Sequence, residues 1–309
     1  MFEKIVMVTR KTRLAELIER FNTVGQARFY IEHAGGDFAE YEREDDAYRR
    51  AVESVRRQLD FDLKVQMLDR GLVPTVLFTD KDLIVTLGQD GLVANTAKYV
   101  RGQPIVAVNP DAERFDGILM PFSPAQARGA VGTVLSGKAR TRAVTMAEAR
   151  FSDGQRLLAF NDLFLGARSH VSARYRIAVD GKSEQHSSSG VLVSTGAGST
   201  GWISSVFNMV GGVSAAMGGA GCAAGCAAAR MGWEDPRLFF VTREPFVSRH
   251  STAALVAGWI ADGRELVLES AMPMGGCVFS DGVEADSVEF NAGATVRVRR
   301  AQETAQLVF

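Results

Sequence analysis

Short apolar runs alternate with amphipathic stretches along the first third of the chain. Residues 5–9, 83–87 and 104–108 predict strands, and the solidly apolar run 83–87 is typical of a strand buried on both faces of a parallel sheet. Residues 41–59 predict a helix, because their apolar side chains recur on one face. A helix over about 92–100 would complete a strand–helix–strand unit, which implies ligand sites at the carboxyl ends of the strands.

Weaker signals accompany these elements. Residues 28–33, 65–68 and 73–78 are candidate strands, and residues 122–135 could form one helix. We therefore expect an α/β domain with a parallel sheet over residues 1–122.

After residue 121 the pattern changes to β-like runs separated by turn residues such as Ser152-Asp153-Gly154 and Ser280-Asp281-Gly282. Such turns favour a hairpin-rich antiparallel domain. We expect a β-rich, β-sandwich-like domain over residues 123–291. Its predicted strands are 143–151, 157–165, 173–179, 190–195, 238–242, 254–260, 265–268, 277–279 and 295–298.

Composition and charge narrow the function classes. The 309 residues are 46% hydrophobic, with 35 Lys and Arg against 36 Asp and Glu, so disorder and fibrous structure are excluded and no global field favours nucleic acid or an anionic membrane. Any bound anion must therefore be held by backbone N–H groups or a few placed side chains.

Cys222, Cys226 and Cys277 cannot form a disulfide framework, and no signal peptide is evident, so a cytoplasmic location is expected.

One long segment carries no charge. Residues 187–229 lack any Asp, Glu, Lys or Arg, and residues 210–229 are mostly small. A membrane span is the alternative, but Leu, Ile, Val and Phe are sparse there and glycine weakens a helix. A glycine-rich loop beside a site is favoured.

Two glycine patterns fail as nucleotide motifs. Residues 132–139 approach a P-loop, but Ala139 occupies the position whose hydroxyl would hold Mg²⁺. Residues 196–201 match G-x-G-x-x-G, yet the next acidic residue is Glu234, too far along the chain to grip a ribose as in a dinucleotide fold.

The best-placed glycine pattern is Gly88-Gln89-Asp90-Gly91. It follows the strongest predicted strand and precedes a helix, so its N–H groups would face a phosphate and Asp90 would be a lone carboxylate at the strand end. An isolated pattern of this kind is commonly only a turn. A ligand-binding role for residues 88–91 gains support from polar residues that we expect nearby.

These polar residues are Asn109, at the end of the next strand, and the pair Asn161-Asp162, which interrupts an apolar run. A polar pair in such a run is either a satisfied core feature or a binding pair. Together with the glycine loops, these residues fit a nucleotide site.

The combination resembles the NAD kinases, which transfer the terminal phosphoryl group of ATP to the 2′-hydroxyl of the adenosine ribose of NAD to give NADP. Residues 88–91 resemble the family's GGDG loop, Asn161-Asp162 its asparagine–acid pair, and residues 195–202 (Thr-Gly-Ala-Gly-Ser-Thr-Gly-Trp) its glycine-rich TGSTAY-type segment. The divergent mitochondrial type is most similar, on residues 108–114, 168–175 and 188–190.

The resemblance implies the NAD kinase/diacylglycerol kinase-like fold, with a C-terminal tail of about 292–309 returning to the first domain. It implies NAD and ATP as substrates, Mg²⁺ accompanying ATP with no tightly bound protein metal, and a homodimer or homotetramer. Nucleic acid and membrane partners are not expected.

The resemblance also implies roles for individual residues. Asp90 would be the catalytic base, and Gly88, Gln89, Gly91 and Asn109 would form the phosphate and nucleotide site. The residues implied to bind NAD are Asn161, Asp162, Ser189, Thr195, Gly198, Ser199, Thr200, Gly201 and Trp202.

Four departures from the family pattern keep alternatives open. Gln89 replaces glycine and Leu92 replaces threonine on the donor side, while Asp162 is shorter than the usual glutamate and Ser189 replaces a bacterial aspartate. The alternatives are a catalytically silent nucleotide-binding regulator and a kinase of the same fold that acts on a lipid or nucleoside hydroxyl. The donor (ATP, another triphosphate or polyphosphate) and the choice between NAD and NADH also stay open.

Overall fold

The computed structural model describes residues 2–219 and 231–309. The chain divides into two compact units, an N-terminal unit of Met1–Arg142 with Gln306–Phe309 and a C-terminal unit of Ala143–Ala305. Each unit builds its own hydrophobic core.

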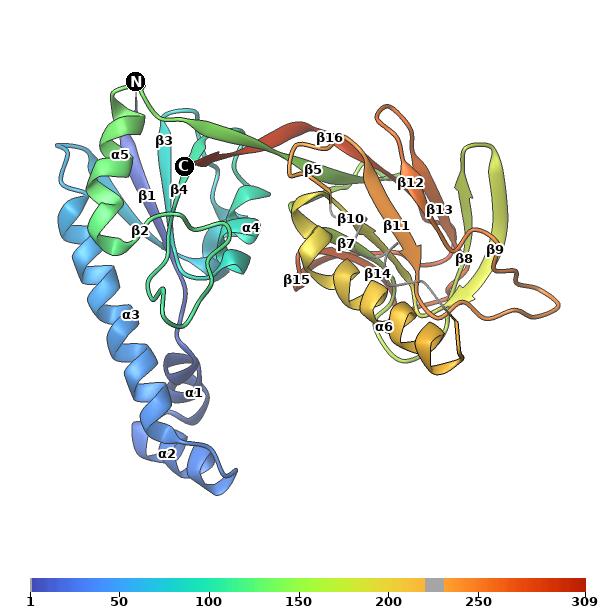
Figure 1. Cartoon of the computed structure of the whole chain (residues 1–309), viewed down its shortest axis with the longest axis horizontal. Helices are drawn as coiled ribbons and strands as arrows, with labels where there is room; N and C mark the ends of the chain where they lie inside the picture. The colour runs from blue at the N-terminus through green and yellow to red at the C-terminus, as the bar shows by residue number, and fades with distance from the viewer. Residues whose placement is uncertain (1, 220–230) are drawn as a thin grey trace. The chain divides into compact units, whose positions relative to one another are not determined.

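A parallel sheet forms the centre of the N-terminal unit (Figure 1). Its strand order is β2 (Lys64–Asp69), β1 (Lys4–Thr9), β3 (Asp82–Leu87) and β4 (Pro104–Val108), with the end of β16 (Thr295–Val308) beside β4. Every residue of β3 is buried, because helices cover both faces of the sheet.

The helices α3 (Phe38–Gln58) and α5 (Ala127–Leu135) cover one face of this sheet, and α4 (Asp90–Ala97) lies on the other (Figure 1). Tyr48 and Val55 of α3 pack against apolar side chains of β1 and β3. The predicted helix over 41–59 and the predicted strand–helix–strand unit are therefore present.

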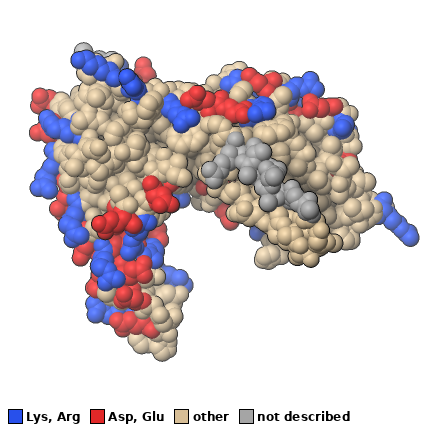
Figure 2. Space-filling view, in the orientation of Figure 1, with Lys and Arg blue, Asp and Glu red and all other residues tan. Residues whose placement is uncertain are grey.

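Two short helices, α1 (Arg13–Phe21) and α2 (Val24–His33), pack beside the first half of α3 and form with it a helical arm (Figure 1). Leu14, Ala27 and Ile31 make a small separate core there. Figure 2 shows basic and acidic side chains interspersed over the helices of this unit.

The C-terminal unit is a sandwich of two sheets. One is antiparallel, in the order β12 (Ala257–Ile260), β11 (Leu238–Thr242), β10 (Val191–Ser194), β7 (Asp162–Ala167), β14 (Gly276–Ser280) and β15 (Val283–Glu289). The other contains β9 (Lys182–Ser188), β8 (Ala173–Val179), β13 (Leu266–Ser270), β16, β5 (Thr141–Phe151) and β6 (Arg156–Ala159).

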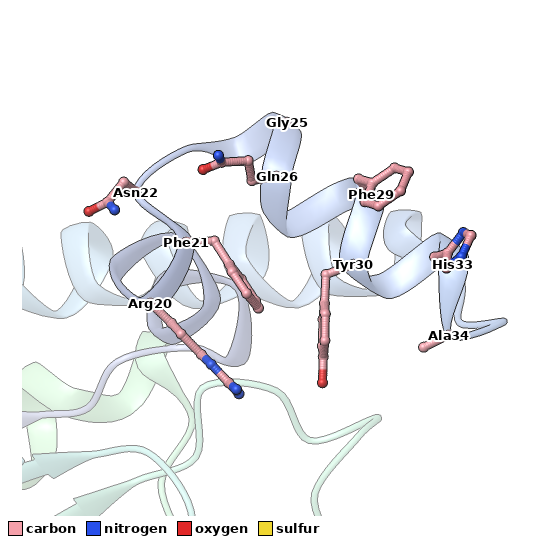
Figure 3. A pocket seen from close by; sticks show the side chains of 9 residues that line it. All are labelled: Arg20, Phe21, Asn22, Gly25, Gln26, Phe29, Tyr30, His33 and Ala34. Carbon is pink, nitrogen blue, oxygen red and sulfur yellow. The ribbon is translucent and has the colours of Figure 1, made fainter.

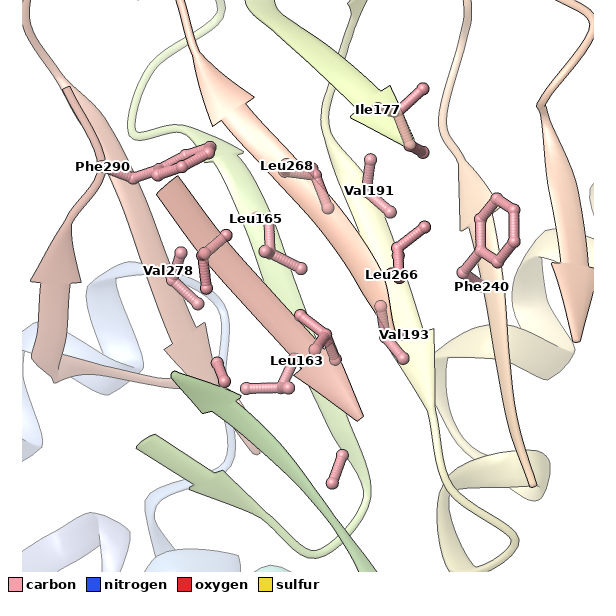
Figure 4. Close-up of a cluster of buried hydrophobic side chains, with 14 of the residues drawn as sticks. Leu163, Leu165, Ile177, Val191, Val193, Phe240, Leu266, Leu268, Val278 and Phe290 are labelled. Carbon is pink, nitrogen blue, oxygen red and sulfur yellow. The ribbon is translucent and has the colours of Figure 1, made fainter. Parts of the chain in front are cut away.

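Alternate side chains of the two sheets fill the space between them (Figure 4). Leu163 and Leu165 of β7 face Leu266 and Leu268 of β13 in this core. Helix α6 (Trp202–Ala216) covers the opposite face of the six-stranded sheet through Ile203 and neighbouring apolar residues. That helix carries no charged residue, and Figure 2 shows a largely uncharged surface over it.

Two predicted strands of the N-terminal unit are wrong. Residues 28–33 belong to α2, which Thr23 caps by accepting a hydrogen bond from the Gln26 N–H at 3.2 Å. Residues 73–78 begin inside a 3₁₀ helix, η1 (Arg70–Thr75), where Pro74 has no N–H to give to a sheet.

Two predictions for the C-terminal unit also need correction. The run 157–165 is two strands in different sheets, separated by a turn at Phe160 and Asn161. The uncharged segment favoured as a loop contains the short helix η3 (Ala197–Thr200) and then α6 up to Ala216. The end of that segment, with Cys222 and Cys226, lies outside the described residues.

The division of the chain differs from the predicted boundary after residue 122. Residues 123–142 stay with the N-terminal unit, because η2 (Pro124–Gln126) and α5 pack against α3 and the parallel sheet. Only Gln306–Phe309 return to this unit, whereas the earlier part of β16 pairs with β13, with Val298 opposite Leu266. The polar strands β9 and β15 were not expected from the sequence, because their residues show little apolar alternation.

Candidate functional site

The four residues of the best-placed glycine pattern join β3 to α4, with Gly88 and Gln89 between the two elements and Asp90 and Gly91 in the first turn of α4. Strand β3 ends at Leu87, and α4 begins at Asp90 with Gln89 as its N-cap, whose side chain makes no capping hydrogen bond. The N–H groups of a helix's first turn lack partners within the helix and attract anions. We call residues 88–91 the phosphate turn, after the ligand that we propose for them.

The two glycines of the phosphate turn differ in how much space a side chain would have. A Cβ on Gly88 would lie 2.6 Å from Cδ2 of Leu92, which is buried. A Cβ on Gly91 would meet nothing within 4 Å, and Gly91 is exposed. Packing therefore explains Gly88, whereas Gly91 leaves open space beside a helix N-terminus. Leu92 is a core residue, so the absence of a threonine hydroxyl there follows from packing.

Asp90 is held at one oxygen. Its Oδ1 accepts a hydrogen bond from the Leu119 N–H at 2.8 Å, and its other oxygen has no partner among the described residues. The side chain is half-buried. The carboxylate is thus oriented by the loop that follows β4 and keeps one oxygen free to accept a proton.

Asn109 shapes that loop. Its Nδ2 donates to the Phe115 carbonyl at 2.9 Å, and its Oδ1 accepts from the Asp111 N–H at 3.0 Å. A Cβ on Gly117, which has a φ of +64°, would lie 2.5 Å from the same Nδ2. The amide predicted to contact a nucleotide is therefore engaged in holding the loop that carries Leu119.

In the C-terminal unit, Asp281 organises the turn that contains Asn161 and Asp162. Its carboxylate accepts hydrogen bonds from the N–H groups of Phe160, Asn161 and Asp162 at 3.0, 2.6 and 3.2 Å. In the sequence, Asp281 belongs to a predicted turn, and no role in the site was predicted for it. A carboxylate followed by glycine after a strand was the available signal.

Asp162 is buried, and its side chain has no hydrogen-bond partner among the described residues. Burial, followed by the negative charge of Asp281, raises the pKa of Asp162 to about 7. The half-buried Asn161 side chain beside it also has no hydrogen-bond partner in the described part of the chain. Both groups can therefore accept or donate hydrogen bonds to a ligand.

The glycine-rich segment packs against the same turn. The Thr195 hydroxyl donates to the Phe160 carbonyl at 2.6 Å, and the Thr195 N–H donates to the Asn161 carbonyl at 2.9 Å. A Cβ on Gly198 would lie 2.1 Å from that Asn161 carbonyl oxygen. Thr195 and Gly198 thus have structural roles at the turn. Ser199 is buried as well, whereas Thr200 and Gly201 are exposed at the start of α6.

Trp202, at the start of α6, lines a pocket of about 190 Å³ that we call the aromatic pocket. Its ring stacks with Phe164 at a centroid distance of 5.7 Å, and the Arg243 guanidinium lies 5.3 Å from the Trp202 centroid. The lining residues are Phe164, Ala167, Arg168, Trp202, Arg243, Cys277, Phe279, Glu284 and Ser287.

The aromatic pocket and Asp162 lie on one face of the six-stranded sheet. Asp162 and Phe164 are two residues apart on β7, so their side chains point to the same side, and Phe279 of β14 is directly opposite Phe164. Ser189 lies close by in the chain fold, since its N–H donates to the Arg243 carbonyl at 2.9 Å and its hydroxyl bonds Glu244.

A second cavity, of about 730 Å³, lies on the helical arm (Figure 3). Arg20, Phe21 and Tyr30 point to the same side of it, with Phe21 and Tyr30 at a centroid distance of 4.8 Å. None of the predicted site residues lines this cavity. Within residues 2–219 and 231–309, no group of three His, Cys, Asp or Glu side chains is arranged to hold a metal ion, and no helix combines the length and apolar character needed to cross a membrane.

Comparisons by sequence give no relatives, since no family model matches the chain and no curated protein matches it significantly. Solved structures do match. Yeast NADH kinase complexed with NADH is 17% identical with a TM-score of 0.59, over 100% of this chain and 84% of that chain. An NAD kinase from Archaeoglobus fulgidus in complex with ATP is 16% identical with a TM-score of 0.55, over 99% of this chain and 93% of that chain.

The chain therefore has the two-part fold of the NAD kinases, an α/β unit with a parallel sheet and an antiparallel β-rich unit. The predicted fold class is confirmed, and the resemblance stated from the sequence is confirmed at the level of the fold.

Proposed function

We propose that the protein is an NAD kinase that transfers the terminal phosphoryl group of ATP to the 2′-hydroxyl of the adenosine ribose of NAD, giving NADP. The observation that carries the proposal is the placement of Asp90, a carboxylate with one free oxygen beside the open N-terminus of α4, in a chain with the fold of kinases solved with NADH and with ATP.

The donor side would use the phosphate turn. Phosphoryl transfer depends mainly on positioning and on stabilising charge on the moving group, and MgATP brings its own cation as substrate. The exposed Gly91 lets phosphate oxygens approach the backbone N–H groups at the start of α4. Gln89 is exposed and does not fill the space beside Gly91.

Acceptor roles are proposed for residues of each unit by itself. Asp90 would take the proton of the attacking 2′-hydroxyl on its free oxygen. Asn161 and Asp162 would hold the adenosine by hydrogen bonds. The aromatic pocket, with its Trp202 and Phe164 faces and the Arg243 cation, is large enough for one planar ring of the dinucleotide.

The experiment is to incubate the protein with ATP, Mg²⁺ and NAD and to quantify NADP with a NADP-specific dehydrogenase. Asp90→Asn should lower kcat by at least about 100-fold, because an amide cannot take the proton. The matched control is Asp80→Asn, an exposed carboxylate near the other end of β3. Equal rates for Asp90→Asn and the parent protein would refute the base assignment.

The same assay separates the alternatives. NAD binding without NADP formation would favour the silent regulator, and turnover with NADH, polyphosphate or another triphosphate would redefine acceptor or donor. One reason for the regulator hypothesis, the replacement of threonine by Leu92, is weaker because Leu92 is a core residue. The homodimer or homotetramer and the cytoplasmic location stay predictions.

A further inference from the structure

Two buried polar residues of α3, Glu44 and Tyr48, lie one helical turn apart. Tyr48 contacts the residue that precedes the phosphate turn. Glu44 is 6% exposed and Tyr48 is 7% exposed. Such groups are retained in an interior only with partners, and their partners here come from segments far apart in the chain. Neither residue was predicted to be a site residue.

Tyr48 joins the ends of two neighbouring strands. Its hydroxyl donates to the Leu87 carbonyl at 2.8 Å and accepts from the Arg10 N–H at 2.9 Å. Leu87 is the residue before Gly88, and Arg10 directly follows β1. Burial raises the pKa of Tyr48 to about 12, so the hydroxyl keeps its proton at neutral pH. One side chain thus fixes the backbone from which the phosphate turn begins.

Glu44 joins the helical arm to the loop after β4. Its Oε2 accepts from Nε of Arg13 at 2.6 Å and from Nη1 of Arg114 at 3.0 Å, and its Oε1 accepts from Nη2 of Arg10 at 3.2 Å. Burial alone would raise the pKa of Glu44, but the hydrogen bonds from Arg13 and Arg10 lower it below its usual value. The carboxylate therefore stays ionised and holds Arg114.

The loop that Glu44 holds is the one that orients Asp90. Arg114 lies in it between Asn109, which fixes its start, and Leu119, whose N–H bonds Asp90. A continuous set of contacts therefore runs from Glu44 through Arg114 and the loop to the Asp90 carboxylate. A misplacement of about 1 Å at a reacting group can cost about 100-fold in rate.

We propose that Glu44 and Tyr48 are positioning residues for phosphoryl transfer, Tyr48 by fixing the phosphate turn and Glu44 by fixing the loop that orients Asp90. The inference rests on the proposed function for its kinetic part. Its structural part concerns the order of residues 109–122 and holds with or without activity.

The kinetic test uses Glu44→Gln and Tyr48→Phe. We expect kcat to fall about tenfold or more in Glu44→Gln, with a smaller change in the KM for NAD, and the KM for ATP to rise in Tyr48→Phe. Glu44→Asp, which keeps the charge, should recover part of the rate. The controls are Glu42→Gln and Tyr41→Phe on the same helix, since Glu42 pairs with Arg28 at the exposed surface.

The second measurement is hydrogen–deuterium exchange of the peptide 109–122 without nucleotide. Glu44→Gln should speed exchange there, and Glu42→Gln should not. Unchanged exchange in Glu44→Gln, or control variants that lose as much rate as their partners, would overturn the proposal. If the parent protein phosphorylates no acceptor while exchange still depends on Glu44, the proposed function fails and the coupling of Glu44 to the loop stands.

Discussion

The carboxylates of Asp162 and Asp281 share one turn, and only that of Asp281 receives backbone hydrogen bonds there. The charge of Asp281 is stabilised by three N–H groups, whereas Asp162 is buried without a hydrogen bond among the described residues. A carboxylate in this setting keeps its proton to a higher pH, which gives Asp162 a pKa of about 7.

This pKa predicts a pH-dependent stability. Because the folded-state pKa of Asp162 lies above the ordinary 3.8, the folded protein binds more protons than the unfolded chain between about pH 4 and pH 7. The associated stability is fully present below about pH 4 and is lost as the pH rises through 7. Asp162→Asn, neutral at every pH, should therefore raise the unfolding free energy at pH 8 by up to about 4 kcal/mol.

Urea unfolding followed by tryptophan fluorescence measures this change. All three tryptophans, Trp202, Trp233 and Trp259, lie in the C-terminal unit, so the signal reports that unit. The exposed Asp153→Asn serves as control and should show no gain at pH 8. Parallel pH profiles for Asp162→Asn and the parent protein would contradict the shifted pKa.

Gly91 separates a ligand contact from a packing requirement. Since a Cβ there meets nothing within 4 Å, Gly91→Ala should fold normally and gain up to about 1 kcal/mol of stability from reduced chain entropy. If phosphate approaches the backbone at this residue, kcat/KM for ATP should fall about tenfold or more. Steady-state kinetics with varied ATP checks this.

Two other glycines provide the comparison. Gly129→Ala, in α5 with nothing within 4 Å, should match Gly91→Ala in stability and keep full activity. Gly198→Ala should cost the C-terminal unit about 1–3 kcal/mol or more, because its Cβ would overlap the Asn161 carbonyl. Full activity in Gly91→Ala would contradict phosphate binding at the phosphate turn.

The aromatic pocket predicts a selective effect on NAD. Trp202→Leu removes the ring that faces Phe164 and Arg243, so the KM for NAD should rise about two- to tenfold while the KM for ATP changes little. The matched variant is Trp259→Leu, whose ring lies under Arg237 at 4.4 Å outside the pocket. Equal effects of the two variants on the KM for NAD would argue against base binding in the pocket.

Residues close in sequence could be placed without the structure. The buried run of β3, followed by Gly88 and Asp90, predicted a strand, a turn and a helix correctly, because periodicity and turn chemistry act over a few residues. The same local logic placed the turn after β14 at residues 280–282. It failed for α2, whose short aromatic run resembles a strand until the Thr23 cap and the packing of Ile31 are known.

The sequence by itself determined the two-part architecture and the segments that carry candidate chemistry, since burial patterns and glycine turns are written in local order. Only the tertiary structure decided what those segments touch. Asp281 accepts hydrogen bonds from residues 160–162, Arg243 lies over the Trp202 ring, and Glu44 pairs with Arg114. The residues in each contact are too far apart in the chain for a local sequence pattern to link them. These contacts arise when sheets and helices pack their apolar faces, and packing brings together polar groups whose spacing in sequence carries no signal.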